Sequence, residues 1–388
     1  MENLKKTIIL KSTLACNLRC KYCYEFNRLN HNKPDVQNMS AETTVNIIDQ
    51  FSRLFPKSII LWMFHGGEPL TIGTKTFNII ANHIREINQS RDVTYKIALQ
   101  TNGTLINDNW CMALNLHKDL FSERIVSISI DGTKNYNDDA RITQAGEGTF
   151  DRIKAGIEKI QLIGMNTTTI SVVGKHNVKH PKEIYRFIRE LNPHMAKFIP
   201  CYNFDEHGKT ERLGIRPLEY ADFICSIFDC WMHDLPTMND DRWLVIDPIA
   251  TIIASIRHSV VQWCEYRREK CENFLNILPN GDLWLCDTFN QDLHRKSGYR
   301  GNLFEMTDDE LMRIITDTQE LFDYFQFKED LMRECDSCSV NEICNGGCLP
   351  LRHVMRTISD ELAVEHCEAK RKTIRRIKEV VEYAMLES

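Results

Sequence analysis

The chain has 388 residues, of which 43% are hydrophobic and 26% are charged, and its formal net charge is -6. These values are typical of a globular protein with two or three domains. The negative charge argues against a general nucleic-acid or membrane-surface binder. No segment approaches the roughly 18 uncharged apolar residues of a membrane-spanning helix, so we expect no nucleic acid and no membrane among its partners.

The 15 cysteines are too many for an ordinary cytosolic enzyme. The N-terminal sequence MENLKKTIILKSTLAC does not resemble a secretory signal peptide, because its apolar stretch is short and is interrupted by Lys11. We therefore expect a cytoplasmic protein, in which thiols stay reduced. Clustered cysteines in such a protein indicate metal ligands rather than disulfides.

Over residues 1–210, short β-rich runs alternate with helical patterns. We expect strands at residues 7–13, 58–64, 93–100, 124–130, 168–174 and 196–201. We expect helices after Ser40, a residue type that favours the N-cap position, and near 75–88, 106–119, 149–163 and 181–191. This alternation predicts the α/β class, as a parallel sheet or a partial barrel with its chemistry at the carboxyl ends of the strands.

The pattern changes in the second half of the chain. Residues 216–263 are mostly helical, and cysteines become dense from Cys264 onward, with a brief β segment at 281–286 and a charged amphipathic helix at 367–388. We therefore predict three parts, which are a core barrel (1–210), a helical bridge (211–263) and a small cysteine-rich domain (264–388).

Three cysteines follow the first predicted strand in the sequence CNLRCKYC, namely Cys16, Cys20 and Cys23. A tight loop can direct three thiolates at one iron–sulfur cube and leave its fourth iron open. An open metal position indicates a reactive site rather than a structural one. A molecule with an amine and a carboxylate, such as S-adenosylmethionine (SAM), can chelate the open iron, and the reduced cluster can then split a C–S bond to give a 5'-deoxyadenosyl radical.

This motif, with Tyr22 before its last cysteine, resembles that of the radical SAM superfamily. The sequences HGGEPL (65–70), LQTNGTLI (99–106) and SISIDGTKNYNDDAR (127–141) follow the second, third and fourth predicted strands and resemble further motifs of the family. Asn137 departs from the pattern, because relatives often have His there, which puts the role of that position in doubt. The resemblance implies that SAM is bound by Tyr22, Gly66, Gly67, Glu68, Pro69, Gln100, Asn102, Ser129 and Arg141.

Eight further cysteines form two complete four-ligand sets, which by themselves are compatible with two zinc ions or two clusters. Their spacings resemble those of the SPASM domain, so the expected fold is a partial (β/α)6 TIM-like radical SAM barrel, then a SPASM domain with a C-terminal helix. The resemblance implies an auxiliary cluster I on Cys264, Cys271, Cys286 and Cys348. It implies an auxiliary cluster II on Cys335, Cys338, Cys344 and Cys367. The cofactors are then three [4Fe-4S] clusters and SAM.

Asp287 follows Cys286 directly, and a carboxylate beside a cluster can accept the proton that a substrate radical loses on oxidation. In SPASM peptide-modifying enzymes, a Cys-Asp pair at this place supplies such a base, and the alternative role is a hydrogen bond within the cluster loop. Cys201, just past the sixth strand, is a candidate hydrogen-atom donor or a buried small residue. Tyr24 can line the substrate pocket or contribute to packing.

The resemblance implies a radical SAM oxidoreductase that abstracts hydrogen from a ribosomally made precursor peptide and receives electrons from flavodoxin or ferredoxin. We predict a cyclophane-type cross-link between side chains as the product. The alternatives are formylglycine formation from Cys or Ser, as in anaerobic sulfatase-maturating enzymes, and peptide epimerisation. A non-catalytic zinc-binding module is a further alternative from a different class.

Overall fold

The computed structural model describes residues 4–25, 38–235, 243–261, 263–268, 271, 273–288, 298–316 and 322–386. Ten strands of this part of the chain form one sheet in the order β10-β9-β8-β1-β2-β3-β4-β5-β6-β7. They are β1 (Lys5–Leu10), β2 (Ile59–Phe64), β3 (Thr94–Thr101), β4 (Ile125–Ser129), β5 (Asn166–Val173), β6 (Met195–Pro200), β7 (Val245–Asp247), β8 (Phe274–Ile277), β9 (Asp282–Trp284) and β10 (Tyr299–Asn302). The first six confirm the predicted strands to within a few residues.

The six predicted strands pair in parallel and in chain order, as a (β/α) barrel requires. Two short strands extend this parallel sheet, with β7 beside β6 and β8 beside β1. Strands β9 and β10 continue it in antiparallel pairing. The sheet therefore runs across both predicted domain boundaries, and the division at 210 and 263 stays a prediction.

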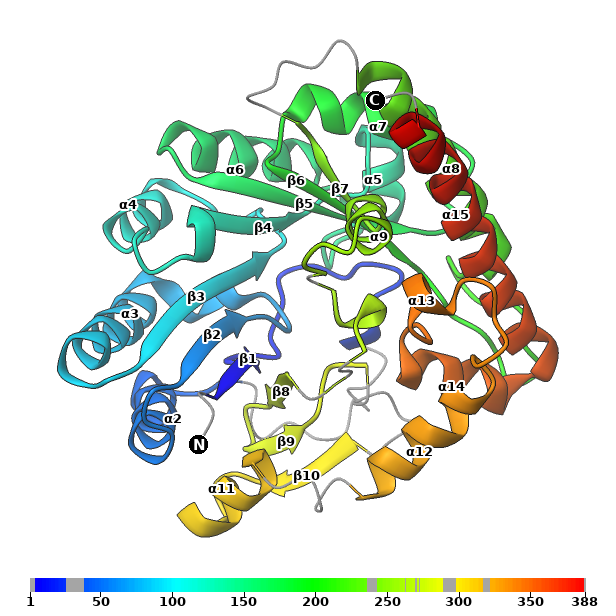
Figure 1. Cartoon of the computed structure of the whole chain (residues 1–388). Helices are drawn as coiled ribbons and strands as arrows, with labels where there is room; N and C mark the ends of the chain where they lie inside the picture. The colour runs from blue at the N-terminus through cyan, green and yellow to red at the C-terminus, as the bar shows by residue number, and fades with distance from the viewer. Residues whose placement is uncertain are drawn as a thin grey trace.

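Helices cover the outer face of the curved sheet (Figure 1). In the barrel these are α2 (Ala41–Leu54), α3 (Gly73–Ser90), α4 (Asp108–Leu116), α5 (Lys134–Ala140), α6 (Phe150–Leu162) and α7 (Pro181–Leu191), with short 3-10 helices η1 (Pro69–Ile72) and η2 (Ser122–Arg124). The Oγ of Ser40 accepts a hydrogen bond from the Thr43 amide at 2.9 Å, which confirms it as the N-cap of α2.

The strands bury alternate residues under these helices. In β2, Ile60, Trp62 and Phe64 are buried, and Trp62 contacts the Phe51 ring of α2 at a centroid distance of 5.5 Å. The residues between them point to the inside of the barrel and are only half-buried. Because parallel sheets are normally covered on both faces, the half-buried inner face shows that solvent reaches the inside of this barrel.

The second half of the chain is helical apart from its short strands. Its helices are α8 (Pro217–Asp234), α9 (Ile249–Ile256), η4 (Cys264–Tyr266), α11 (Asp308–Thr316), α12 (Phe322–Arg333), α13 (Asn341–Cys344), α14 (Leu349–Ile358) and α15 (Asp360–Leu386). The predicted C-terminal helix is confirmed, and it starts earlier than predicted. Within the described residues, no helix combines the length and the apolar character needed to cross a membrane.

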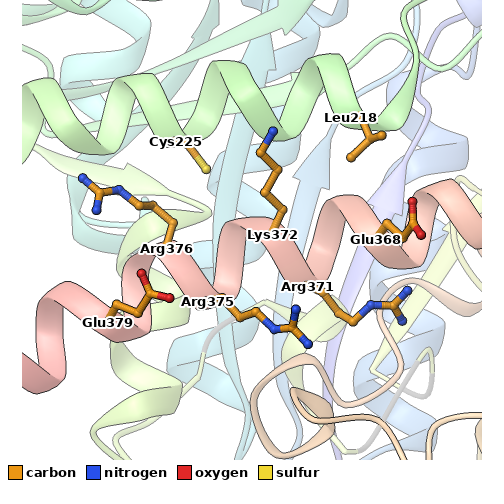
Figure 2. A pocket seen from close by; sticks show the side chains of 8 residues that line it. All are labelled: Leu218, Cys225, Glu368, Arg371, Lys372, Arg375, Arg376 and Glu379. Carbon is orange, nitrogen blue, oxygen red and sulfur yellow. The ribbon is translucent and has the colours of Figure 1, made fainter.

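Helix α15 lies along α8, and the two helices line a surface groove (Figures 1 and 2). Lys372 and Arg376 of α15 pair with Asp222 and Asp229 of α8, the latter at 2.6 Å from Arg376 Nη2. Part of the basic face of α15, which the sequence suggests to be merely solvated, thus joins the C-terminal helix to the bridge.

Candidate active site

The first three cysteines lie in a loop between the carboxyl end of β1 and Tyr24. The amide of Glu68 donates to the Ala15 carbonyl oxygen at 2.8 Å, which fixes the loop to the segment after β2. Burial raises the pKa of the Cys16 thiol to about 11 and that of the Cys20 thiol to about 12. Their charges also act on one another and on Cys23, so the three thiols lie near each other. A bound metal would supply the positive charge that such thiolates need.

The GGEP segment passes unusually close to this loop. Gly66 and Gly67 have positive φ angles of 83° and 49°. A Cβ on Gly67 would lie 2.4 Å from the Ala15 carbonyl oxygen, and one on Gly66 would lie 2.7 Å from Cγ of Lys11. Both the backbone conformation and the space therefore require glycine here.

Glu68 is fully buried and holds the loops after β2 and β3 together. Its Oε1 accepts hydrogen bonds from the Thr101 hydroxyl at 2.6 Å and the Leu70 amide at 3.0 Å, and its Oε2 accepts from the Asn102 amide at 2.7 Å. Burial raises the pKa of this carboxyl, although these donors act in the opposite direction. Glu68 thus positions the segments after β2 and β3 relative to each other.

Asn102 links the third strand end to the cysteine loop. Its Nδ2 donates to Oδ1 of Asn17 at 2.9 Å and lies 3.9 Å from Sγ of Cys16. Gln100 and Ser129, also predicted to bind SAM, are half-buried at the carboxyl ends of β3 and β4. Alternation along each strand puts them on the barrel's inner face.

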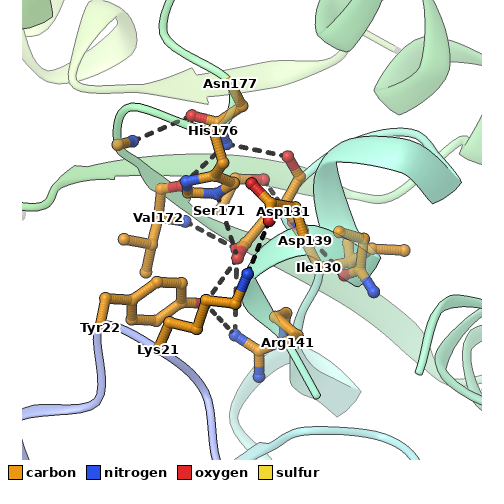
Figure 3. Close-up of polar contacts among 12 residues, drawn as sticks. Lys21, Tyr22, Ile130, Asp131, Asp139, Arg141, Ser171, Val172, His176 and Asn177 are labelled. Atoms are coloured by element: carbon orange, nitrogen blue, oxygen red, sulfur yellow. Dashed lines mark hydrogen bonds and ion pairs between the residues drawn. The ribbon is translucent and has the colours of Figure 1, made fainter. Parts of the chain in front are cut away.

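Asp131 is the centre of a buried polar network (Figure 3). Its Oδ2 accepts from the Tyr22 hydroxyl at 2.6 Å, and the same hydroxyl accepts from Nη1 of Arg141 at 2.5 Å. His176 Nε2 lies 3.6 Å from Asp131 Oδ2, and the Val172 amide donates to Oδ1 at 2.9 Å. Burial raises the pKa of Asp131, but Arg141, His176 and Tyr22 lower it more, so the net shift is downward.

This network ties Tyr22 of the cysteine loop to the ends of β4 and β5. Arg141, predicted to touch SAM, is buried and oriented by Tyr22. Asn137 is fully buried, and its Oδ1 accepts from the Asp131 amide at 3.3 Å. In this chain Asn137 therefore supports the turn that carries Asp131.

The candidate base Asp287 lies beside the first cysteine loop, although the two are far apart in sequence. Lys11 Nζ lies 2.6 Å from Asp287 Oδ1 and also pairs with Glu25. Asn276 Nδ2 donates to Asp287 Oδ1 at 2.9 Å, and the Tyr24 hydroxyl donates to Oδ2. The Lys11 side chain is fully buried, whereas Asp287 keeps 19% of its side chain exposed. Both carboxylate oxygens of Asp287 are thus engaged, and a small part of its side chain remains exposed.

Cys201 lies directly after β6 and is 8% exposed. Burial raises the pKa of its thiol to about 12. The structure gives it the surroundings of a buried small residue.

Two members of the first predicted four-cysteine set, Cys264 and Cys286, lie near a third member, Cys348. Burial raises the pKa of the Cys348 thiol, and the nearby charges of Glu265, Cys264 and Cys286 raise it further. Cys271, the fourth member, is buried and has a left-handed backbone conformation, with φ of 63°.

The second set lines one pocket, formed by Cys335, Cys338, Cys344 and Cys367 and hereafter called the four-cysteine pocket. The residues after Cys344 make a tight turn, in which Asn345, Gly346 and Gly347 all have positive φ angles. This turn leads to α14, whose Arg352 places Nη1 3.4 Å from Sγ of Cys335.

The four thiols of this pocket surround a common space. Among the residues that the structure describes, no three His, Cys, Asp or Glu side chains converge closely enough to hold a single ion. A [4Fe-4S] cluster binds each thiolate at a separate iron, so its ligands surround a space. The four-cysteine pocket has that arrangement, and all of its thiols are free of disulfides.

Comparison with known proteins defines the class. Residues 10–188 match the model of the Radical SAM superfamily. This range contains the cysteine loop, the GGEP segment and the Asp131 network. The chain is therefore a radical SAM enzyme, and this family uses a [4Fe-4S] cluster and SAM. The alternative of a non-catalytic zinc module is thereby wrong.

The chain is also similar to particular maturases over most of its length. The serine-type anaerobic sulfatase-maturating enzyme of Bacteroides thetaiotaomicron is 26% identical, over 89% of this chain and 83% of that protein. The cysteine-type enzyme of Clostridium novyi is 25% identical, over 88% of this chain and 87% of that protein.

Solved structures show the same fold. Native anSMEcpe with bound AdoMet has a TM-score of 0.81 at 22% identity, over 97% of this chain and 98% of that one. Streptococcus suis SuiB bound to its precursor peptide SuiA has a TM-score of 0.62 at 16% identity, over 92% and 74%. The fold prediction, including the cysteine-rich part after the barrel, is therefore confirmed.

Sequence reasoning missed several residues of this site. Lys11, Glu25 and Asn276 surround the Tyr24–Asp287 pair, and His176 completes the Asp131 network. The sequence held one usable signal, which is a lysine directly after the apolar run Ile8–Leu10. The other residues carry no motif.

Proposed function

We propose that this enzyme oxidises a serine or cysteine side chain of a protein substrate to formylglycine. The observation that carries the proposal is Asp287, held by Lys11, Asn276 and Tyr24 beside the cysteine loop while 19% of its side chain stays exposed. The similarity to both serine-type and cysteine-type sulfatase-maturating enzymes over most of the chain supports this substrate class. It favours formylglycine formation over the predicted cyclophane product.

We assign the cofactors as follows. Cys16, Cys20 and Cys23 hold the cluster that binds SAM. Auxiliary cluster I takes Cys264, Cys271, Cys286 and Cys348, and auxiliary cluster II takes the four-cysteine pocket. SAM is bound by Tyr22, Gly66, Gly67, Glu68, Pro69, Gln100, Asn102, Ser129 and Arg141, and a flavodoxin or ferredoxin supplies electrons. These assignments are supported by the close approach of Gly67 to the cysteine loop and by the four thiols around one pocket.

When bound, the cofactors supply the radical that removes one hydrogen atom from the substrate carbon and the acceptor for the electron released next. The carbon radical then loses one electron and one proton. For serine this gives the aldehyde, and for cysteine it gives a thioaldehyde that water converts to the aldehyde and hydrogen sulfide. Asp287 takes the proton. Lys11 stabilises the carboxylate before the transfer, and Asn276 and Tyr24 hold it in place.

The test uses anaerobically reconstituted enzyme, SAM, a reductant and the active-site peptide of a sulfatase from the same genome, in serine and cysteine forms. We expect an aldehyde that reacts with a hydrazide, detected by mass spectrometry. Loss of two hydrogens without an aldehyde, with fragmentation blocked between two residues of a precursor peptide, would instead support the cross-link. Unchanged composition with deuterium uptake from solvent would support epimerisation.

A further inference from the structure

The wall of the four-cysteine pocket contains a fixed guanidinium group. Arg352 on α14 is buried, and its Nη1 lies 3.0 Å from the Gly346 carbonyl oxygen as well as 3.4 Å from Sγ of Cys335. Its Nη2 donates to the Leu331 carbonyl oxygen at 3.2 Å. The backbone thus holds the guanidinium while the same group donates toward a thiol of the pocket.

His366 is a second polar group in this wall. Only 2% of its surface is exposed, and neither ring nitrogen has a hydrogen-bond partner within the described part of the chain. The ring packs edge-on against Tyr202 at a centroid distance of 6.0 Å. Buried polar atoms are normally hydrogen-bonded, so the partner of this imidazole is expected to be whatever fills the pocket.

Two other cationic side chains line the pocket, Lys370 and Arg371. Lys370 pairs with Glu265, and its Nζ lies 3.2 Å from the Tyr266 hydroxyl. Arg371 also lines the surface groove between α8 and α15. Arg352 also lies 3.3 Å from Glu334, but that carboxylate is 41% exposed, which weakens its hold. Arg352 and His366 are therefore the donors best placed to serve an occupant.

We propose that Arg352 and His366 donate hydrogen bonds to sulfur atoms of the iron–sulfur cluster in the four-cysteine pocket and raise its reduction potential. The inference rests on the cluster assigned to this pocket under the proposed function. A cluster with four thiolate ligands is an anion, and reduction adds one electron to it without forming or breaking a bond. Donors and positive charge stabilise the more negative reduced form most, which makes this cluster an electron acceptor.

The test is an EPR-monitored redox titration of the full-length, reconstituted enzyme without SAM or substrate. His366→Phe keeps the ring contact with Tyr202 and removes both nitrogens. We expect the midpoint of this cluster to become more negative, so that its reduced-to-oxidised ratio at the wild-type midpoint falls about tenfold. Arg352→Gln removes a charge as well and should shift the midpoint further.

Arg376→Gln is the control, because Arg376 pairs with Asp229 of α8 outside the lining of the four-cysteine pocket. It should leave the midpoint unchanged. Cys335→Ala identifies the EPR signal of the pocket, since it should reduce that signal and the iron content.

Two results would overturn the inference. One is an unchanged midpoint in both His366→Phe and Arg352→Gln with full iron content. The other is loss of this cluster's iron in His366→Phe, which would make the histidine a ligand rather than a donor. Because the titration needs no substrate, either result leaves the formylglycine proposal to its own test by mass spectrometry.

Discussion

Two cysteine sites of this enzyme, the first cysteine loop and the four-cysteine pocket, differ in the charges around their thiols. Beside the first loop lie the buried carboxylates Glu68 and Asp131, with Arg141 as their counter-charge. The four-cysteine pocket is instead lined by Arg352 and Lys370. SAM carries a sulfonium and an ammonium group, which acidic and acceptor-rich surroundings favour, whereas a cluster that stores an electron is favoured by cations. Under the proposed cofactor assignments, the first site would bind a cation and the second would accept an electron.

The largest expected effect comes from removing a ligand on either side of this comparison. Cys16→Ala should abolish SAM cleavage and remove about four irons per chain. Cys335→Ala should remove a similar amount of iron and leave reductive cleavage of SAM to 5'-deoxyadenosine measurable. Iron analysis and chromatographic measurement of 5'-deoxyadenosine check both variants. Equal loss of cleavage in both would remove the functional distinction between the regions.

The variant Asp287→Asn should have the next largest effect. The side-chain amide of the new asparagine cannot take a proton, so product formation should fall about 10²- to 10⁴-fold while SAM cleavage continues. The ratio of 5'-deoxyadenosine to modified peptide, measured by mass spectrometry, separates the two steps. Normal product yield would show that Asp287 only supports the loop after Cys286.

Gly67→Ala tests the close approach of the GGEP segment to the first cysteine loop. The added Cβ would lie 2.4 Å from the Ala15 carbonyl oxygen, and we expect SAM affinity to fall about 10- to 100-fold, since overpacking of this kind costs about 1–3 kcal/mol. Gly73→Ala is the matched control, because φ is also positive there, at 81°, but no atom lies within 4 Å of the Cβ. Equilibrium dialysis with SAM and thermal unfolding compare the two variants. Equal losses of SAM affinity would contradict a role in SAM binding for the close approach of Gly67 to the cysteine loop.

Lys11→Met should give the smallest effect on turnover, about tenfold, because Asp287 keeps Asn276 and Tyr24 as partners. The substitution also leaves two carboxylates without their shared cation, and removal of one partner of a buried ion pair costs about 3–5 kcal/mol. Peptide turnover and denaturant unfolding measure the two effects. Lys5→Met, at the exposed start of the same strand, is the control, and equal behaviour of both variants would refute a specific role for Lys11.

Strand order, most helix positions and the fold class followed from the sequence, because apolar periodicity and capping are local properties. Short strands such as β7 and β8 escaped prediction, since three or four residues carry no periodicity and are defined by pairing with β6 and β1. The two four-cysteine sets were predicted instead from the resemblance to the SPASM domain, because their members are spread over residues 264–348 and 335–367.

The first cysteine motif and the glycine loops were determined by the sequence alone, because each of them lies within one short segment. Tertiary structure alone decided what surrounds them. Lys11 meets Asp287 only because β8 pairs with β1 and brings the segment that carries Asp287 beside the N-terminal strand. Arg352 and His366 share a wall only because α14 and α15 pack around the same pocket. Contacts between residues far apart in sequence depend on how the sheet and helices close, and local patterns do not contain that information.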